Sequence, residues 1–175
     1  MSQASNHLAW CINKAKKELE DCRNQGKRPK HRGLVKITPD LERAKKHLGK
    51  AEHNLKAITY LLKGNFEDVS VSMVFYSMYH CMLAIAARFG YESRNQTCTI
   101  ALMQSLKEEG KIDIDDKHIN MFKYAEAETE ENVIEMREEY TYGTELTVIN
   151  KDKINDLIED CKKLIDAARE IVLNK

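Results

Sequence analysis

The chain has 175 residues, of which 42% are hydrophobic and 32% charged, with only seven glycines and two prolines. This length suits one well-buried core, and the composition excludes a disordered or predominantly β protein. The formal net charge is zero, but residues 1–37 hold nine basic and three acidic side chains, whereas residues 113–145 hold eleven acidic and three basic ones. Such segregation either orients partners, or two copies of the chain, or reflects two solvated helix faces of opposite sign.

The sequence predicts neither a membrane span nor a secretory leader. The most apolar run, residues 69–89, is interrupted by Ser72, Ser77 and His80, whereas a span needs about 18 nearly uninterrupted apolar residues. The chain begins with polar residues and reaches Trp10 before any sustained apolar segment, which is unlike a secretory signal. We therefore expect a soluble, cytoplasmic protein.

The five cysteines are odd in number and include no Cys-x-x-Cys pair. Most of them stand where an apolar residue would serve on a helix, and a free cysteine behaves as a small hydrophobic residue. We expect reduced core thiols, with a structural disulfide, as in a thermophilic protein, as the alternative.

A first helix is predicted over residues 5–23, because apolar residues recur there at three- and four-residue spacing. Residues 27–33 follow as a basic segment punctuated by Pro29 and Gly33, which is the one candidate linker in the chain. Residues 34–37 are too short to assign.

The second helix is the firmest prediction. Thr38 is expected to cap it, with Pro39 and Asp40 in its first turn. Apolar residues then alternate three and four apart from Leu41 to residue 62 and form one stripe along the helix. Gly64 and Asn65 form the turn, and Asn65 is expected to cap the next helix.

Four further helices are predicted in the rest of the chain. Residues 69–89 are apolar on nearly every side and predict the central helix of a bundle, stopped by Gly90. Residues 95–108 form a shorter helix closed by Gly110. A fifth helix follows residues 113–116, runs past Met136 and weakens at residues 140–143, and the last begins near Asn150.

Six helical segments with short connections and no alternating strand pattern predict an all-α, up-and-down helical bundle. It would have four to five core helices plus an N-terminal helix. We expect a single domain over residues 1–175, with residues 1–37 as N-terminal helix and basic loop and residues 38–175 as the bundle.

The sequence gives no sign of a metal or cofactor site. Helical di-iron bundles use Glu-x-x-His, which does not occur here. His47 and His53 are six apart, which places them roughly 240° apart around a helix. The glycines are scattered singly, so no phosphate-binding loop is predicted.

Polar residues of the central helix are expected to be structural. His80 lies in the apolar run and is predicted to be buried and hydrogen-bonded rather than catalytic. Tyr60, Tyr76 and Tyr79 are predicted to be core residues whose hydroxyls find partners at the edge of the bundle.

The most suggestive polar cluster is residues 137–143. An arginine and two tyrosines at a helix end can grip a phosphate and stack a base, because guanidinium pairs bidentately with phosphate and phenol rings offer π faces. The alternative for Arg137 is a simple ion pair with a glutamate of its own or a facing helix.

The order of several segments resembles a known family. Residues 76–84, followed by Phe89, Gly90 and Tyr91, resemble the central helix of HEPN proteins, where an aromatic, small, Met, aromatic, His run precedes a glycine turn. Residues 48–55 resemble the preceding family helix, which contains a Lys-Ala pair. Residues 98–103 and 137–142, together with Trp10 and Cys11, resemble the archaeal branch of the family.

The HEPN resemblance implies a four- to five-helix bundle, usually a homodimer in which the arginine-bearing helices meet near the two-fold axis. Many members are ribonucleases or toxins that use an arginine followed, after four to six residues, by a histidine. Some members pair with a small nucleotidyltransferase that acts as antitoxin. Arg137 matches the arginine, but the three possible histidine positions hold Tyr142, Gly143 and Thr144. None of these is a general base at neutral pH.

We therefore expect a HEPN-type homodimer that binds nucleotide or RNA, or a small nucleotidyltransferase as one half of a toxin–antitoxin pair, without efficient nuclease activity. The expected binding residues are Arg137, Tyr140 and Tyr142, with Arg94 and Asn95 as weaker candidates, and any catalytic role falls to Arg137 and Tyr142. One alternative is an active, metal-independent ribonuclease whose base is another residue, such as His80 or His118. A second is a structural adaptor that assembles through its basic first loop and acidic fifth helix.

Overall fold

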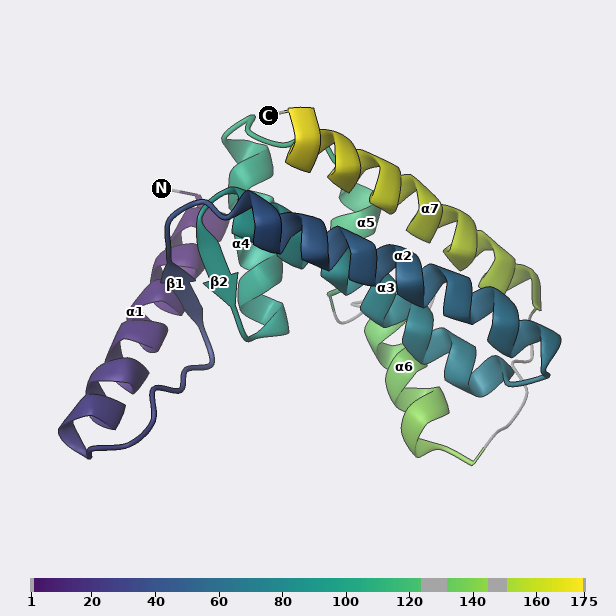
Figure 1. The fold of residues 1–175 in the computed structure, drawn as a ribbon, viewed down its shortest axis with the longest axis horizontal. Helices are drawn as coiled ribbons and strands as arrows, with labels where there is room; N and C mark the ends of the chain where they lie inside the picture. Colours follow the sequence, from purple (N-terminus) through teal and green to yellow (C-terminus); the bar gives the residue numbers. More distant parts are fainter. Residues whose placement is uncertain (1, 124–131, 145–150, 175) are drawn as a thin grey trace.

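The computed structural model describes residues 2–123, 132–144 and 151–174, and it forms an all-α bundle (Figure 1). Within these ranges lie seven helices: α1 (Gln3–Asn24), α2 (Leu41–Lys63), α3 (Glu67–Arg88), α4 (Gln96–Glu108), α5 (Asp116–Asn120), α6 (Val133–Tyr142) and α7 (Lys151–Asn174). Two three-residue strands, β1 (Leu34–Lys36) and β2 (Tyr91–Ser93), accompany them. The all-α bundle predicted from the apolar periodicities is confirmed.

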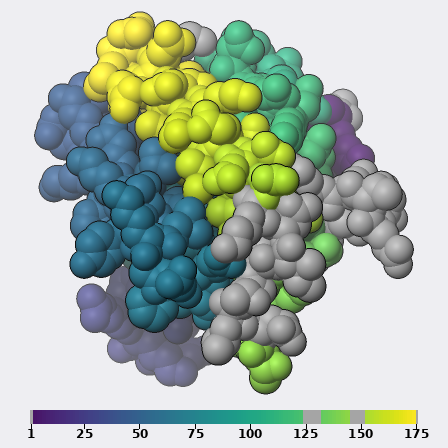
Figure 2. Space-filling model, turned by 90° about the vertical axis from the view of Figure 1, so that its right-hand side faces the viewer, coloured from purple at the N-terminus to yellow at the C-terminus, as the bar shows by residue number. Residues whose placement is uncertain are grey.

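Helix α3 is the interior helix of the bundle. It packs along α2 and also contacts α7, α6 and α4; α7 lies over α2 and α3 and forms part of the face in Figure 2. The buried Ser77 of α3 donates a hydrogen bond from Oγ to the carbonyl of Ala51 at 2.7 Å and accepts one from the thiol of Cys161 at 3.1 Å. The polar atom is thus satisfied inside the apolar core.

Helix α3 is long and apolar enough to cross a membrane by length and composition, contrary to the expectation from the sequence. In the most apolar 18-residue stretch of α3, 61% of the residues are buried inside the protein. The apolar character of α3 is explained by its place at the centre of the bundle, where helices contact it on several sides.

Helix α1 leans away from the bundle and joins it through α4 and β1 (Figure 1). Its buried face consists of Ala4, Cys11 and Ala15. Gly33 lies so close to this face that a Cβ there would come within 2.4 Å of the carbonyl oxygen of Cys11. Only glycine permits this approach of loop to helix.

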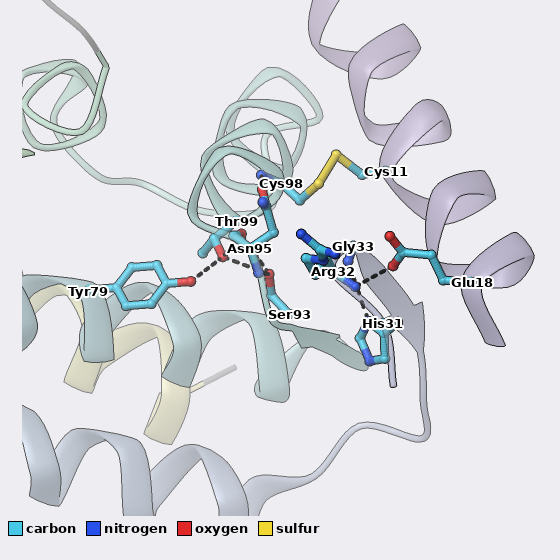
Figure 3. The surroundings of a disulfide bond; sticks show 10 residues. All are labelled: Cys11, Glu18, His31, Arg32, Gly33, Tyr79, Ser93, Asn95, Cys98 and Thr99. Atoms are coloured by element: carbon cyan, nitrogen blue, oxygen red, sulfur yellow. Dashed lines mark hydrogen bonds between the residues drawn. A yellow bond between two sulfur atoms is a disulfide. The ribbon is translucent and has the colours of Figure 1, made fainter. Parts of the chain in front are cut away.

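A disulfide joins α1 to α4 through Cys11 and Cys98, whose Cα atoms are 5.6 Å apart (Figure 3). The prediction of five reduced thiols is therefore wrong for this pair, because the packing of α1 on α4 brings together residues 87 positions apart. Cys22, Cys81 and Cys161 are free. Burial raises the pKa of Cys161 to about 11 and raises that of Cys81 well above its ordinary value, so both remain protonated core thiols.

The predicted helix caps need correction at two turns. Asp40, rather than Thr38, caps α2, since its Oδ1 accepts a hydrogen bond from the backbone N–H of Arg43 at 2.8 Å. Asn65 does not cap α3. It adopts a left-handed conformation with φ of 61°, which asparagine tolerates better than most residues, and Phe66 takes the cap position without a side-chain hydrogen bond.

The two strands were not predicted. They pair antiparallel, with Val35 opposite Glu92, and connect the segment after α1 to the turn after α3. Each strand is too short to show an alternating pattern, so the pairing arises from the position of the neighbouring helices.

The predicted fifth helix is two helices. Helix α5 ends at Asn120, and α6 starts at Val133 after Asn132, whose Oδ1 accepts hydrogen bonds from the backbone N–H groups of Ile134 and Glu135 at 2.8 and 3.3 Å. Asparagine is a favoured N-cap, and this one was overlooked. Residues 124–131, which the predicted fifth helix includes, lie outside the described residues.

Candidate functional site

Arg137 is held on α6 against the aromatic core. Its guanidinium carbon lies 4.4 Å from the centroid of the Phe75 ring on α3, which is a cation–π geometry. Nη2 donates to Oε1 of Glu138 at 3.1 Å, and the side chain is 20% exposed. Among the described residues Glu138 is its one carboxylate partner, so the ion pair with a glutamate of its own helix, which was the alternative for Arg137, is present.

An aromatic cluster fixes the surface beneath Arg137. The Phe75 ring lies 5.8 Å from that of Tyr79 and 5.4 Å from that of Phe122, between centroids. The Tyr79 hydroxyl hydrogen-bonds Thr99 at 3.1 Å (Figure 3), and burial raises the pKa of Tyr79. The predicted core role of Tyr79 is confirmed.

The tyrosines near Arg137 differ in their surroundings. Tyr140 is half-buried and packs against the hydrophobic core, and residues three apart are neighbours on a helix surface. Tyr142 is 80% exposed in the last turn of α6 and, being five residues from Arg137, does not face it. The helix thus brings Arg137 and Tyr140 to one side and leaves Tyr142 apart.

The weaker candidates, Arg94 and Asn95, lie beside β2, apart from α6 (Figure 1). Asn95 caps α4, since its Oδ1 accepts from the backbone N–H of Cys98 at 2.9 Å. Arg94 donates from Nε to Glu92 at 2.8 Å. Both side chains have structural partners in the protein.

The outer face of α3 carries a partly uncovered stripe next to α6. We call the α3 stripe the five residues Val69, Met73, Tyr76, His80 and Leu83, which alternate four and three apart. Val69 and Tyr76 are each 42% exposed and the other three are half-buried. Helix α6 is tied beside the stripe by a 2.9 Å hydrogen bond between Ser72 and Thr141.

His80 pairs with His47 of α2, with their Nδ1 atoms 3.0 Å apart. His80 is half-buried rather than buried, and the hydrogen bond predicted for it is present. Burial, helped by the charge of Lys50, lowers the pKa of His80. Burial, then His80 and Arg43, lowers the pKa of His47 to about 4. Both rings are therefore neutral at pH 7.

Sequence reasoning tested His47 against His53 on the same helix and missed the pair. The signal was available in the short turn at Gly64 and Asn65, because it makes α2 and α3 antiparallel neighbours and places position 47 opposite position 80.

His118, the other alternative base, is 5% exposed on α5, and neither ring nitrogen has a hydrogen-bond partner among the described residues. Burial lowers its pKa in spite of Asp160 and Asp115 nearby. Such a ring cannot reach a substrate without opening of the bundle.

Two of the predicted core tyrosines are at the surface. Tyr60 is 80% exposed and Tyr76 42% exposed, so the prediction is wrong for Tyr60 and only partly right for Tyr76. The described residues include no cluster of three or more metal-ligating side chains.

A cavity of about 440 Å³ lies between the start of α1, α4 and α6. Its polar lining includes Gln3, His7, Gln96, Gln104 and Lys123. Arg137 is not part of this lining, so the cavity and the α6 arginine are separate features.

The comparisons with known proteins agree with the arrangement of helices. No curated protein matches the chain. The family model described as HEPN domain matches residues 44–172, which covers α3 to α6 in full and most of α2 and α7. The bundle from α2 to α7 therefore belongs to the HEPN domain family.

Proposed function

We propose that this chain acts as a HEPN-type homodimer that binds a nucleotide or RNA, or a small nucleotidyltransferase, in a groove shared by the Arg137 side chains of two copies. Membership of the family suggests a function connected with nucleotides, RNA or nuclease chemistry. The observation that carries the proposal is the place of Arg137 beside the partly uncovered α3 stripe.

The α3 stripe has the spacing of a helix that pairs with another helix. Alternating steps of four and three residues keep one seam facing a partner helix over several turns. Val69, Met73, Tyr76 and Leu83 present apolar surface, and such surface next to a core commonly marks a contact between proteins. A second copy of the chain fits, because a two-fold axis pairs the stripe with itself, and HEPN domains often form dimers.

Arg137 is suited to hold a phosphate group. Its contact with Phe75 and its bond from Nη2 to Glu138 fix the guanidinium in one orientation. Nε, Nη1 and the second N–H of Nη2 remain as donors, and the fork that they form matches the paired oxygens of a phosphate. A preorganised arginine loses little entropy on binding. Tyr140, on the same side of α6, offers a ring for stacking on a base.

Efficient cleavage is not expected from this site. Tyr142 stands where the family histidine is expected, and a phenol is a poor general base at neutral pH. We therefore propose that the site binds its nucleotide or RNA without cleaving it. A toxin–antitoxin pair, with a small nucleotidyltransferase as the partner, is the more specific version of this proposal.

The test is titration calorimetry of the purified protein with ATP and with a short single-stranded RNA. Arg137→Ala should weaken binding about tenfold or more, since hydrogen bonds to charged groups contribute about 1.5 to 3 kcal/mol. Arg137→Lys should recover part of the affinity, because the charge remains without the fork of donors.

Arg169→Ala is the matched control, because Arg169 on α7 also pairs with carboxylates of its own chain, Glu52 and Asp166. Its binding should match that of the wild type. If Arg137→Ala leaves the affinities for nucleotide, RNA and a nucleotidyltransferase partner unchanged in a folded protein, the proposed site is wrong.

An active ribonuclease is the second candidate, favoured by His80. This residue lies on the α3 stripe one turn after Tyr76, its neutral ring at pH 7 is able to accept a proton, and His47 orients it. Incubation with single-stranded RNA, with and without a chelator, separates the two candidates. Chelator-resistant cleavage that is lost in both Arg137→Ala and His80→Ala would replace the binding proposal, whereas absence of cleavage supports it.

A further inference from the structure

The segment before the HEPN domain carries a dense positive surface. We call the N-terminal arm α1, the loop of residues 25–33 and β1, all of which precede the matched residues 44–172. Its basic residues are Lys14, Lys16, Lys17, Arg23, Lys27, Arg28, Lys30, Arg32 and Lys36. All but the half-buried Lys14 are exposed.

These cations are not neutralised within the described part of the chain. One ion pair joins His31 of the loop to Glu92. The others described there are made by basic residues after the arm, and none involves a lysine or arginine of the arm. Unpaired like charges on one element repel each other unless an anion binds among them. The arm is therefore a surface for a polyanion.

The loop holds its charges in a fixed place. The backbone N–H of Lys27 donates to the carbonyl of Cys22 at 2.8 Å, and the Cys22 thiol donates to the carbonyl of Lys30 at 3.6 Å. The backbone N–H of Arg32 donates to Glu18 of α1 at 2.5 Å (Figure 3). The loop is thus fastened back on α1, and its basic side chains are displayed without a large loss of entropy on binding.

An exposed aromatic ring accompanies the charges. Trp10, the single tryptophan of the chain, is 54% exposed on α1. The Lys14 ammonium lies 5.0 Å from its ring centroid, and the His7 ring lies 5.8 Å away. An indole beside a cation is a platform on which a nucleobase stacks while its phosphate meets the positive charge.

A groove lies between α1 and β1. It has a volume of about 310 Å³ and is lined by Ala9, Ile12, Leu19 and Val35 together with Asn13. Lys16 and Lys36 complete the lining. An apolar groove flanked by two ammonium groups suits a nucleotide whose flat base lies in the groove and whose phosphate lies at the rim.

We propose that the N-terminal arm binds single-stranded nucleic acid, with the loop and α1 cations on the phosphates and with Trp10 and the α1–β1 groove as contacts for bases. A single strand is favoured over a duplex, because the bases of a duplex are already stacked on each other. This site uses none of the residues of the Arg137 groove and does not depend on dimer formation.

An anionic membrane is a poorer fit for the same charge. A helix that lies on a membrane needs a continuous apolar face. The outward positions of α1 carry Asn6, Asn13, Glu20 and Asn24, and within the described part of the arm Trp10 is the one large hydrophobic residue that is strongly exposed.

The test is fluorescence anisotropy of the full chain with a labelled single-stranded oligonucleotide of about 16 residues, a length within the usual site size. The affinities for RNA and for DNA of the same sequence are measured at 50 and 200 mM salt. Comparing the two also shows whether the arm prefers ribose or deoxyribose in the backbone. The arm variant is Lys27→Gln with Arg28→Gln and Lys30→Gln. The control is Lys46→Gln with Lys56→Gln and Lys63→Gln, which removes the same charge from exposed positions of α2.

The arm variant should bind at least tenfold more weakly and reduce the salt slope by about 2, since each lost phosphate contact contributes about 0.7 for a single strand. The α2 control should bind within about twofold of the wild type. Trp10→Ala should lose about tenfold, and the fluorescence of Trp10 should be quenched by the oligonucleotide in the wild type.

Equal losses in the arm variant and the α2 control would overturn the proposal, as would preferential binding to vesicles of anionic lipid that the oligonucleotide does not displace. The arm variant should lose the same factor in a protein that also carries Arg137→Ala as it does in the wild type, because the arm binds without the Arg137 groove. The arm proposal and the proposal for the Arg137 groove therefore fail independently.

Discussion

His47 and His80 share one short contact between nitrogens, so at least one of the two rings must be neutral for the hydrogen bond to form. Burial is the largest cause of the lowered pKa of both rings, and the neighbouring Arg43 and Lys50 act in the same direction. The free energy of unfolding should therefore depend on pH through this pair, which lies where α2 packs against α3.

The protein should lose stability as the pH falls from about 6.5 toward 4. The pKa of His47 is about 4 in the folded protein and 6.5 when unperturbed, so the unfolded state binds the proton more tightly in this window. His47 contributes on the order of 1 to 2 kcal/mol to this change in the free energy of unfolding. The contribution is this small because solvent screens the charge of a half-buried group. Urea unfolding at pH 7 and pH 4.5 should show a smaller loss in His47→Gln than in the wild type, and equal losses would contradict the assignment.

Gly33 and Gly49 form a matched pair of positions for testing how closely the loop at Gly33 packs against α1. A Cβ at position 33 would lie 2.4 Å from a backbone oxygen of α1, whereas a Cβ at position 49 meets nothing within 4 Å. Gly33→Ala should cost about 2 kcal/mol or more by overpacking, and Gly49→Ala should stabilise by about 0.5 to 1 kcal/mol within α2. Thermal unfolding decides, and a neutral Gly33→Ala would show that α1 is not seated as described.

Single residues were predictable only where helical spacing places them. Tyr60 lies two positions after Ile58 of the α2 apolar stripe, so the helical period itself places it on the solvent side, and its assignment to the core was avoidable. Tyr76 lies in a helix that is apolar all round, and the sequence there contains no period that separates inside from outside. The contact of Arg137 with Phe75 joins two helices and is visible only in three dimensions.

At the scale of elements, strong periodicity and turn residues predicted α1, α2, α3, α4 and α7 to within a few residues. The α5–α6 break was missed because apolar residues continue on both sides of it, and the capping signal of Asn132 was not used. The strands and the disulfide depend on contacts between distant segments, which a single sequence does not record.

The disulfide should contribute strongly to stability. Closing a loop of 87 positions between Cys11 and Cys98 destabilises the unfolded chain by about 4.6 kcal/mol on the chain-entropy model. Replacing both cysteines by alanine should lower the melting temperature by roughly 10 °C. Cys22→Ala, which removes a free thiol from the same helix, should change it little. An unchanged melting temperature in the double variant would contradict a disulfide that fastens α1 to α4.

The α3 stripe should control association of two chains. Tyr76→Glu places a charge in the middle of the stripe and should shift the mass measured by light scattering from dimer toward monomer, because an unpaired charge is costly at an apolar contact. Tyr60→Glu is the control, since Tyr60 is exposed on α2. If both variants keep the wild-type mass, the stripe is not the contact surface.

The whole molecule combines two surfaces of different character. The HEPN bundle presents an apolar stripe beside Arg137, and the N-terminal arm presents an exposed indole and lysines and arginines that form no ion pair within the described residues. The overall charge of zero concealed this division, although the sequence already showed the excess of basic residues in the first 37 positions. A protein that grips a strand with the arm and a nucleotide or RNA end in the groove would use both.

Two chains are proposed to bring their Arg137 residues to one groove, and a distance between spin labels on the two chains measures this directly. Glu139, exposed on α6 two residues after Arg137, is replaced by cysteine and labelled in a protein with Cys22→Ser, where the other free thiols are buried. We predict one narrow distance between the two labels, shorter than about 30 Å, roughly the diameter of a small domain. A sample at the same concentration without dipolar coupling, or with labels much farther apart, would contradict the shared groove.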